Sequence, residues 1–197
     1  MDSDYLLMHI HRVAFLSLGL SAFAACSDDP VQYSDTVGIN LKAKSDDTAS
    51  GVVSDEKGIT TESGNPYGAF VADAHDSLGG APPSSIDVEH LELLLGANSV
   101  GVTALGEIFD GEIDVLFEMN DTGNSIPVAS AQISSSTDGG PIDLSVAFDS
   151  SDLGEADYDK LLNGSFQVLV RGPAATGFET KGADANLQLT FTFGAYE

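Results

Sequence analysis

Apolar and polar residues alternate with a period of two in several separate stretches of this 197-residue chain. In residues 37–43, Val, Ile, Leu and Ala take the odd positions and Gly, Asn and Lys the even ones. A β-strand that buries one face and exposes the other has this period, because successive side chains point to opposite sides of the sheet. The pattern recurs in residues 112–119, 142–148, 166–170 and 187–193. The chain is therefore expected to be an all-β protein.

One expected strand, 86–95, changes phase in its middle. Its apolar residues take the even positions 86 and 88 and then the odd positions 91, 93 and 95. A β-bulge at Glu89-His90 would bring both sets to the same core. Farther along, the residues between strands 112–119 and 126–134 include Asn-Asp-Thr-Gly-Asn, which has the composition of a turn. These two strands are therefore expected to form a hairpin.

Two short segments have helical periodicity. Apolar residues recur at spacings of three and four after Asn65, which is placed to cap a helix start, and Pro66 suits the first turn. A glycine pair, 79–80, would end this helix. A second helix is expected to open at Asp152, with Glu155 three residues on, and to end at an Asn-Gly pair. Two or three short helices are thus expected in the connections between strands.

Together these elements predict one domain. About seven or eight strands that each have one apolar face need a second apolar layer to cover them. We therefore expect a two-sheet antiparallel sandwich over residues 35–197, immunoglobulin-like in general architecture. A closed barrel of the same strands is the alternative.

The first 25 residues have a different character. They comprise a short segment that contains Arg12, an apolar run over residues 13–25, and small residues directly before Cys26. This is the organisation of an export signal, and the run is too short to span a bilayer, which needs about 20 residues. Residues 1–25 are therefore expected to be a signal peptide, and residues 26–34 a tether to the domain.

The sequence Phe23-Ala24-Ala25-Cys26 resembles the lipobox of bacterial lipoproteins. The resemblance implies that the Cys26 thiol is joined to diacylglycerol and that the signal is cut before it. Ser27 stands where many lipoproteins retained at the inner membrane have aspartate, which implies the outer membrane, on its periplasmic or cell-surface face. The strands of residues 86–193 also look like those of uncharacterised envelope lipoproteins with β-sandwich domains, an architectural likeness that implies no activity.

Acidic residues greatly outnumber basic ones. The chain has 31 Asp and Glu against 7 Lys and Arg, a formal net charge of -24. Nucleic acid is excluded as an expected partner, since its binding depends on neutralising phosphates with Lys and Arg. The acids are spread along the chain, which indicates a solvated surface. Because Cys26 is the only cysteine, no internal disulfide is expected, and the core alone must stabilise the domain.

Few residues after the signal offer catalytic chemistry. His75 and His90 are the only histidines there, so a nucleophile-histidine-acid triad would need one of them. His75 falls on the polar side of the first expected helix and His90 at the expected bulge, and both positions are typical of surface histidines. The sequence has no Gly-x-Ser-x-Gly elbow, phosphate-binding glycine loop or zinc-type His/Cys cluster. We therefore do not expect an enzyme.

Carboxylates are the one plentiful reactive group. Calcium is the ion that they would suit, because it takes about six to eight oxygen ligands, often from loops. No other cofactor is expected. The same acids would also serve to cap a helix start or to solvate the surface. The candidate calcium ligands are Asp149, Asp152, Asp157 and Asp159.

The expected function is that of an outer-membrane-anchored lipoprotein with a non-enzymatic binding or structural role in the cell envelope. Its partners would be the membrane, through the lipid anchor, and an envelope protein or glycan. The alternative is a calcium-assisted carbohydrate-binding module, which needs loop carboxylates beside exposed rings, and a carboxylate-based hydrolase is less favoured. The ring candidates are Tyr67, Tyr158 and Tyr196.

Overall fold

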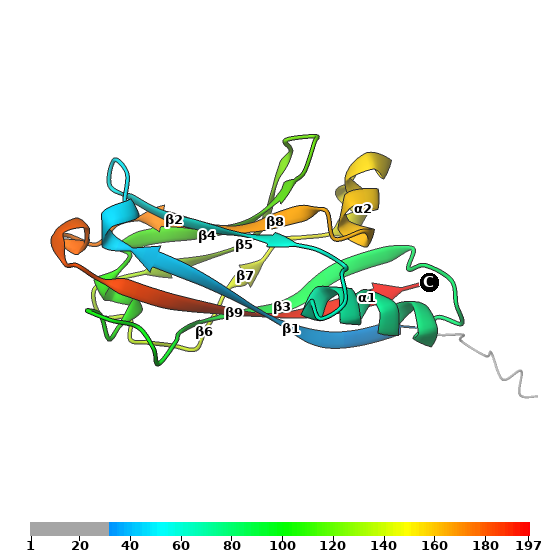
Figure 1. Ribbon diagram of the computed structural model, residues 1–197, viewed down its shortest axis with the longest axis horizontal. Coiled ribbons are helices and arrows are strands. Elements are labelled where there is room, and N and C mark those ends of the chain that lie inside the picture. The colour runs from blue at the N-terminus through cyan, green and yellow to red at the C-terminus, as the bar shows by residue number, and fades with distance from the viewer. Residues whose placement is uncertain (1–31) are drawn as a thin grey trace, which may run out of the picture.

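The computed structural model describes residues 32–197, which fold into two antiparallel β-sheets packed face to face (Figure 1). This is the predicted all-β sandwich, and its strands form separate sheets of four and five strands rather than a closed barrel. The expected signal peptide, 1–25, and the expected lipid-attachment residue, Cys26, lie outside the described residues.

The four-stranded sheet, called sheet A, contains the longest strands in the order β1-β9-β3-β6. β1 and β9 pair over their full lengths, from Gln32 opposite Tyr196 to Lys44 opposite Asp184. The register of β3 on β9 shifts between positions 88 and 90, which confirms the predicted bulge. The strands are β1 (Gln32–Lys44), β3 (Ser85–Leu95), β6 (Ile142–Asp143) and β9 (Asp184–Tyr196).

The five-stranded sheet, called sheet B, has the order β2-β8-β4-β5-β7. β4 and β5 form the predicted hairpin, and their register shifts between Val115 and Leu116. β8 lies between β2 and β4 and pairs with both. The strands are β2 (Val52–Ile59), β4 (Gly111–Met119), β5 (Ser125–Ile133), β7 (Ser145–Val146) and β8 (Phe166–Pro173).

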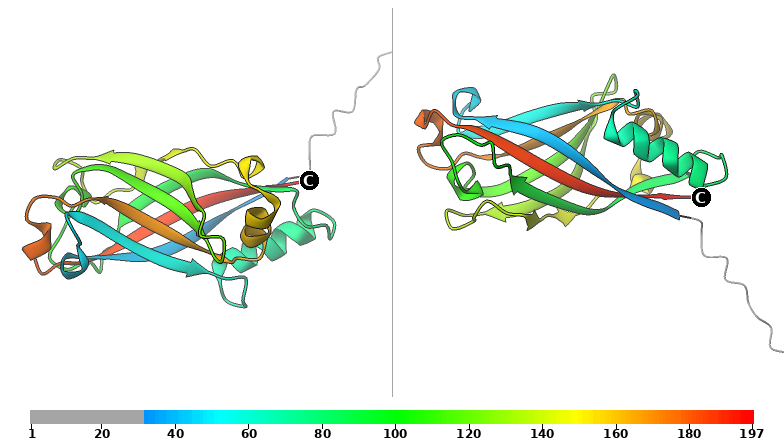
Figure 2. Two further views of the ribbon diagram at one scale, coloured as in Figure 1. Left: turned by 90° about the horizontal axis from the view of Figure 1, so that it is seen from above. Right: turned by 60° about the horizontal axis from the view of Figure 1, so that its bottom comes forward.

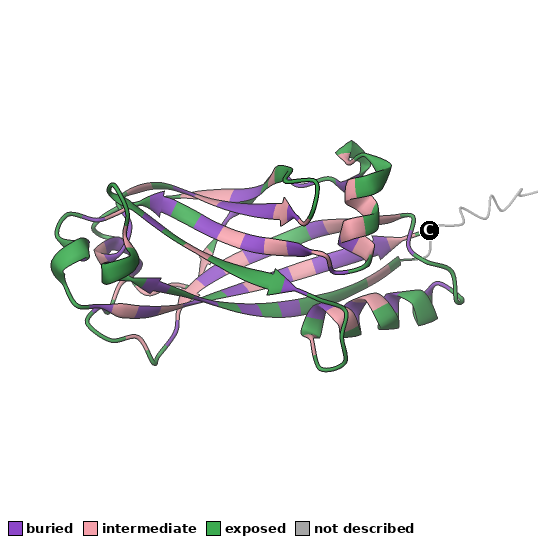
Figure 3. Cartoon of the chain, turned by 45° about the horizontal axis from the view of Figure 1, so that its top comes forward, coloured by how far each residue is buried: buried purple, intermediate pink, exposed green. Residues whose placement is uncertain are grey.

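One hydrophobic core fills the space between the two sheets. Burial alternates along the strands, as their period of two predicts (Figure 3). Phenylalanine rings from both sheets meet there: Phe117 of sheet B stacks on Phe191 of sheet A, with 5.9 Å between ring centroids. Full burial of each such side chain stabilises the fold by roughly 1.5–3 kcal/mol. Among the described residues, every buried core residue lies in residues 37–195, so the segment 32–197 has its own core and is expected to fold as a unit.

Helix α1 (Pro66–Ser77) begins as predicted. The Asn65 side chain accepts a hydrogen bond from the Tyr67 backbone N–H at 3.0 Å. Tyr67 and Phe70 are buried, and both rings pack near Phe193, so α1 closes the core at one end of the sandwich. The second helix, α2 (Glu155–Leu162), the start of β1 and the end of β9 lie at the same end, called the helical end (Figure 2). Neither described helix is long and apolar enough to cross a membrane.

The predicted tether, 26–34, extends too far, because β1 already begins at Gln32. The Tyr33 ring packs against Phe70 at 5.9 Å between ring centroids, and Tyr33 pairs with a residue of β9. The hydroxyl of Ser34 donates to Glu89 Oε2 at 2.7 Å. The last three residues of the predicted tether therefore belong to the sandwich, because all three pair with β9 and the side chains of Tyr33 and Ser34 have partners on α1 and β3.

Residues 142–148, expected to form one strand, divide between the two sheets. β6 pairs with β3 in sheet A, whereas β7 pairs with β5 in sheet B. The chain crosses between the sheets at Leu144, whose N–H donates to the Leu91 carbonyl at 2.9 Å. Leu144 and Phe148 are both buried, so the alternating pattern fills the core although the strand partner changes.

Two further elements differ from the predictions. β2 has no predicted counterpart, because Val53 and Ile59 are its only buried residues and polar ones separate them. The second helix begins at Glu155 rather than at Asp152, which lies in a preceding 3-10 turn. Leu153 separates the turn from the helix because its backbone is extended, with φ -80° and ψ 142°.

Candidate functional site

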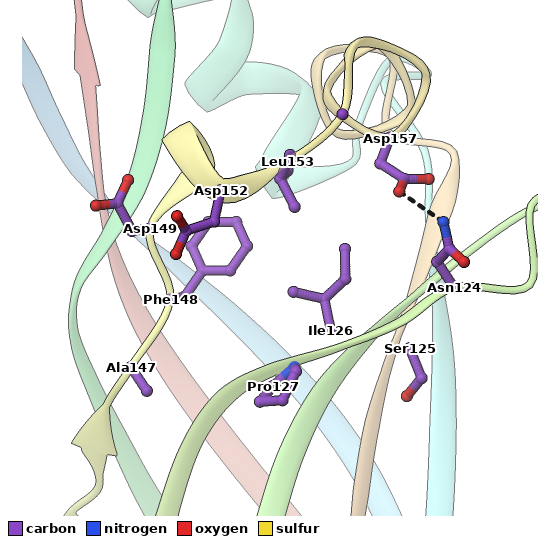
Figure 4. Close-up of a pocket in the computed structure, with 11 residues that line it drawn as sticks. Asn124, Ser125, Ile126, Pro127, Ala147, Phe148, Asp149, Asp152, Leu153 and Asp157 are labelled. Atoms are coloured by element: carbon purple, nitrogen blue, oxygen red, sulfur yellow. Dashed lines mark hydrogen bonds between the residues drawn. The ribbon is translucent and has the colours of Figure 1, made fainter.

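A pocket of about 420 Å³ lies beside α2 at the helical end (Figure 4). The start of β5, the connection after β7 and the first turn of α2 line it. Its lining includes three of the four predicted calcium ligands, Asp149, Asp152 and Asp157, and we call it the acidic pocket. The apolar part of the lining includes Ile126, Pro127, Phe148 and Leu153.

Asp157 braces the rim of this pocket. Its carboxylate accepts hydrogen bonds from Thr122 Oγ1 at 2.9 Å and from Asn124 Nδ2 at 2.7 Å, the second of which is drawn in Figure 4. An ion pair between Lys160 Nζ and Asp121 Oδ2, at 2.6 Å, joins the same two elements. The hydrogen bond and charge of Lys160 hold the pKa of Asp121 below its ordinary value. The β4–β5 turn is thus tied to α2 by two separate contacts.

Asp149 acts as a local cap. Its Oδ1 accepts a hydrogen bond from the backbone N–H of Ser151 at 2.8 Å, at the start of the 3-10 turn 150–152. Hydrogen bonding from Ser151 lowers the pKa of Asp149 from its ordinary value of 3.8. A carboxylate that accepts a backbone N–H stabilises the start of a helical turn. The structure therefore gives Asp149 a structural role whether or not an ion is bound.

The other two predicted calcium ligands are exposed, and they lie in different places. Asp152 lines the acidic pocket, and within residues 32–197 its side chain makes no hydrogen bond or ion pair. Asp159 is not part of the pocket lining, because two residues along a helix turn it about 200° away from Asp157. Among the described residues, no three of the four predicted acids bring ligand atoms within 4.8 Å of one another. A calcium site at these acids stays a prediction.

Of the three tyrosines considered as sugar platforms, Tyr67 is buried, and Tyr158 and Tyr196 are half-buried. Tyr67 is buried in the core, and burial raises its pKa. Burial also raises the pKa of Tyr158 to about 12, and a hydrogen bond to Glu89 raises the pKa of Tyr196 to about 12. Each hydroxyl has an acceptor: Leu161 O for Tyr67 at 3.0 Å, Pro83 O for Tyr158 at 2.8 Å, and Glu89 Oε1 for Tyr196 at 2.8 Å.

The two histidines have different surroundings. His75 is exposed on α1, with Nδ1 3.6 Å from Oδ1 of Asp76. His90 is exposed on the outer face of β3, with Nε2 3.4 Å from Glu92 Oε1 and 3.5 Å from Asp143 Oδ1. In the described part of the chain, this is the one set of three metal-ligating side chains whose ligand atoms lie within 4.8 Å of one another. We call these three residues the His90 cluster.

The sequence by itself points to only one member of the His90 cluster. The change of phase in its strand draws attention to His90. The alternation of Leu91, Glu92 and Leu93 predicts only that Glu92 faces outward. Asp143 joins the cluster because β6 pairs with β3. No local signal in the sequence predicts that pairing.

No protein-family model matches the chain. No curated protein matches it either. Among solved structures, the chain is similar to a chain in the structure of Cocksfoot mottle virus. The two have 12% sequence identity and a TM-score of 0.29, and the match covers 98% of this chain and 95% of that chain. A TM-score of this size supports no conclusion about function.

Proposed function

We propose that the chain is a lipoprotein attached to the bacterial outer membrane through Cys26, with a non-enzymatic binding or structural role in the cell envelope. The observation that carries this proposal is the lipobox-like sequence Phe23-Ala24-Ala25-Cys26, directly after an apolar run and shortly before a β-sandwich that begins at Gln32. A cysteine that carries two or three acyl chains makes membrane attachment effectively permanent.

The arrangement of the sandwich supports attachment by the helical end. Six residues, 26–31, precede β1, and they span at most about 20 Å when fully extended. The helical end would then face the lipid surface. The loops 45–51 and 177–183, at the opposite end of the long strands, would point away from it and be accessible to an envelope partner (Figure 2).

The surface composition also favours a covalent anchor. A net charge of -24 opposes adsorption to anionic lipid headgroups. Among residues 32–197, the exposed large apolar side chains are Val52 and Val100, at 41% and 62% exposure. Two valines bury too little apolar area to hold a domain on a bilayer. The lipid would therefore supply the membrane affinity.

Metabolic labelling with an alkyne fatty acid tests the anchor. We expect the full chain, expressed in a Gram-negative host, to become labelled and to sediment with the outer membrane. Replacement of Cys26 by Ser should abolish both. Mass spectrometry should identify an acylated N-terminal peptide that begins at Cys26. An unlabelled protein, or a mature N-terminus elsewhere, would contradict the proposal.

The acidic pocket favours a second candidate function, a calcium-assisted module that binds an envelope glycan. Three predicted calcium ligands line this one pocket beside Phe148 and Pro127. Asp149 and Asp157 already accept internal hydrogen bonds, so Asp152 is the ligand most available to an ion. The pocket has no exposed ring on which a sugar would stack, which places this candidate second.

Thermal unfolding of the segment 27–197 tests the second candidate. A rise in Tm with millimolar calcium, absent with magnesium at equal ionic strength, would indicate a defined carboxylate site. The variant Asp152→Asn should lose that rise, and Asp159→Asn should keep it. Equal effects of the two ions would mean that the pocket acids only solvate and brace the surface.

A further inference from the structure

The His90 cluster is held by regular sheet backbone. His90 and Glu92 are two residues apart on β3, so both point to the outer face of sheet A. Asp143 of β6 stands directly opposite Glu92 in the antiparallel register. The three side chains therefore start from fixed backbone positions, which is the arrangement that favours a defined site.

The spacing of the ligand atoms fits a tetrahedral metal ion. His90 Nε2 lies 3.4 Å from an oxygen of Glu92 and 3.5 Å from an oxygen of Asp143. A zinc ion with bonds of about 2.0–2.2 Å keeps its ligand atoms about 3.3–3.5 Å apart. The third separation, between the two carboxylates, is within 4.8 Å, and the side chain of Asp143 is 77% exposed, so it can rotate to close on one ion.

The charges of the cluster also favour a divalent cation. Glu92 and Asp143 are like charges in directly opposed positions, an arrangement that destabilises a pair of strands. His90 offsets one of these two charges, and only when it is protonated. A divalent cation would neutralise both carboxylates and would use the neutral imidazole as a ligand.

We propose that the His90 cluster binds one zinc ion. The ligands are His90 Nε2 and one oxygen each from Glu92 and Asp143, and the fourth position is left to water or to a group from a partner. The imidazole favours zinc over calcium and magnesium, which take oxygen ligands. The site lies on the outer face of sheet A, and its assignment depends neither on the acidic pocket nor on the lipid anchor.

Equilibrium dialysis of the segment 27–197 tests this site. The segment keeps every core residue of the part that the structure describes. It omits His9 and His11, so His75 and His90 are its only histidines. Dialysis against micromolar zinc chloride, with millimolar calcium chloride to occupy ordinary carboxylates, should leave one zinc ion per chain. Loss even of a group that only orients a ligand lowers metal affinity about 10- to 100-fold, so His90→Ala should lower it at least that much. Asp143→Asn should also weaken binding.

His75→Ala is the matched control, since Asp76 is the only acidic partner of His75 among residues 32–197, and this variant should bind zinc as the wild type does. Circular dichroism should show that all variants fold alike, because the substituted side chains are exposed. In NMR spectra, zinc should shift the ring signals of His90 and leave those of His75 unchanged. The proposal is overturned if the wild type retains no zinc under calcium, if His90→Ala binds as tightly as the wild type, or if zinc shifts both rings equally.

Discussion

In the acidic pocket, Asp149 and Asp157 accept hydrogen bonds from their own surroundings, whereas on the outer face of sheet A, Glu92 and Asp143 face each other and share one partner, His90. The pocket lies where irregular connections meet at the helical end, and the cluster lies on two paired strands. Both regions are acidic and partly exposed, yet their carboxylates have different immediate neighbours.

This difference shows that the number of acids in a region is a poor guide to cation binding. A carboxylate that accepts N–H or O–H donors already has its charge stabilised, and it holds a cap or a turn in place. Glu92 and Asp143 stand in direct cross-strand register and, among the described residues, share only the His90 ring as a partner. Like charges in such positions repel each other, so a cation relieves an existing unfavourable interaction. Substitutions can therefore test the two regions one at a time, because each can remove the contacts that hold one region in place and leave those of the other unchanged.

The largest expected effect is at Phe148, which lines the acidic pocket and packs against Phe117 at 5.1 Å between ring centroids. Phe148→Ala should lower the free energy of unfolding by about 3–5 kcal/mol, because it removes a buried ring that ties the segment after β7 to the core. Urea denaturation measures the loss. Zinc retention by the folded protein should not change, since the His90 cluster does not contact this ring. A loss below about 1 kcal/mol would mean that the ring is not an anchor.

Gly140 supports the region of the His90 cluster, because it lies against β3 just before β6. Its φ is +84°, and a Cβ there would lie 2.6 Å from the backbone oxygen of Leu93 on β3. Gly140→Ala should therefore destabilise the fold by about 1–3 kcal/mol and displace β6, which lowers zinc affinity with it. Gly139→Ala is the control, because its Cβ would meet only ordinary contacts at 3.5 Å or more. Similar unfolding curves for both variants would refute the idea that β6 needs this close approach.

Substitution of Asp157, at the rim of the acidic pocket, is expected to have a smaller effect on stability. Asp157→Ala removes the acceptor of Thr122 and Asn124 and should lower the free energy of unfolding by about 1 kcal/mol. Hydrogen exchange in the β4–β5 turn should become faster. Asp159→Ala removes the same charge from the same helix and should have little effect on either measurement. Equal effects of the two substitutions would show that charge, and not bracing, is what matters.

The smallest effect is the pH dependence of the cap at Asp149. Its pKa is lowered in the folded state, so the folded protein binds fewer protons there than the unfolded chain. The stability from this cap is present above the ordinary value of 3.8 and is lost as the pH falls through the lowered pKa. Asn also caps helical turns, so Asp149→Asn should retain the turn and lose only this pH dependence. Urea denaturation over a range of acidic pH would reveal the difference, and identical profiles would contradict it.

Much of the fold is predictable because its signals are local. Asn65 and Pro66 predict the start of α1, and the change of phase around Glu89 predicts the bulge in β3. β2 escapes prediction because Val53 and Ile59 are its only buried residues, as expected of an edge strand. The boundary at Gln32 is missed because the contact between Tyr33 and Phe70 joins distant parts of the chain.

The sites are less predictable than the fold. The acids from Asp149 to Asp157 are close in sequence, and the structure places three of them around one pocket. Two of these three already have structural roles, because Asp149 caps a turn and Asp157 braces the rim. The His90 cluster depends on Asp143, which reaches β3 through the pairing of β6, directly before the chain changes sheets at Leu144. A period of two predicts that Leu144 and Phe148 are buried, but it does not predict which sheet each neighbouring residue joins.

The amino-acid order alone determines four features: the strand periodicity, the helix cap at Asn65, the acidic surface and the lipobox-like end of the first 26 residues. These depend on residues close together in the chain, whose interactions are local. The tertiary structure alone decides the division of β6 and β7 between two sheets, the edge position of β2 and the register that sets Glu92 opposite Asp143. These depend on contacts between distant segments, and the register that forms is the one that buries the apolar face of every strand in a single core.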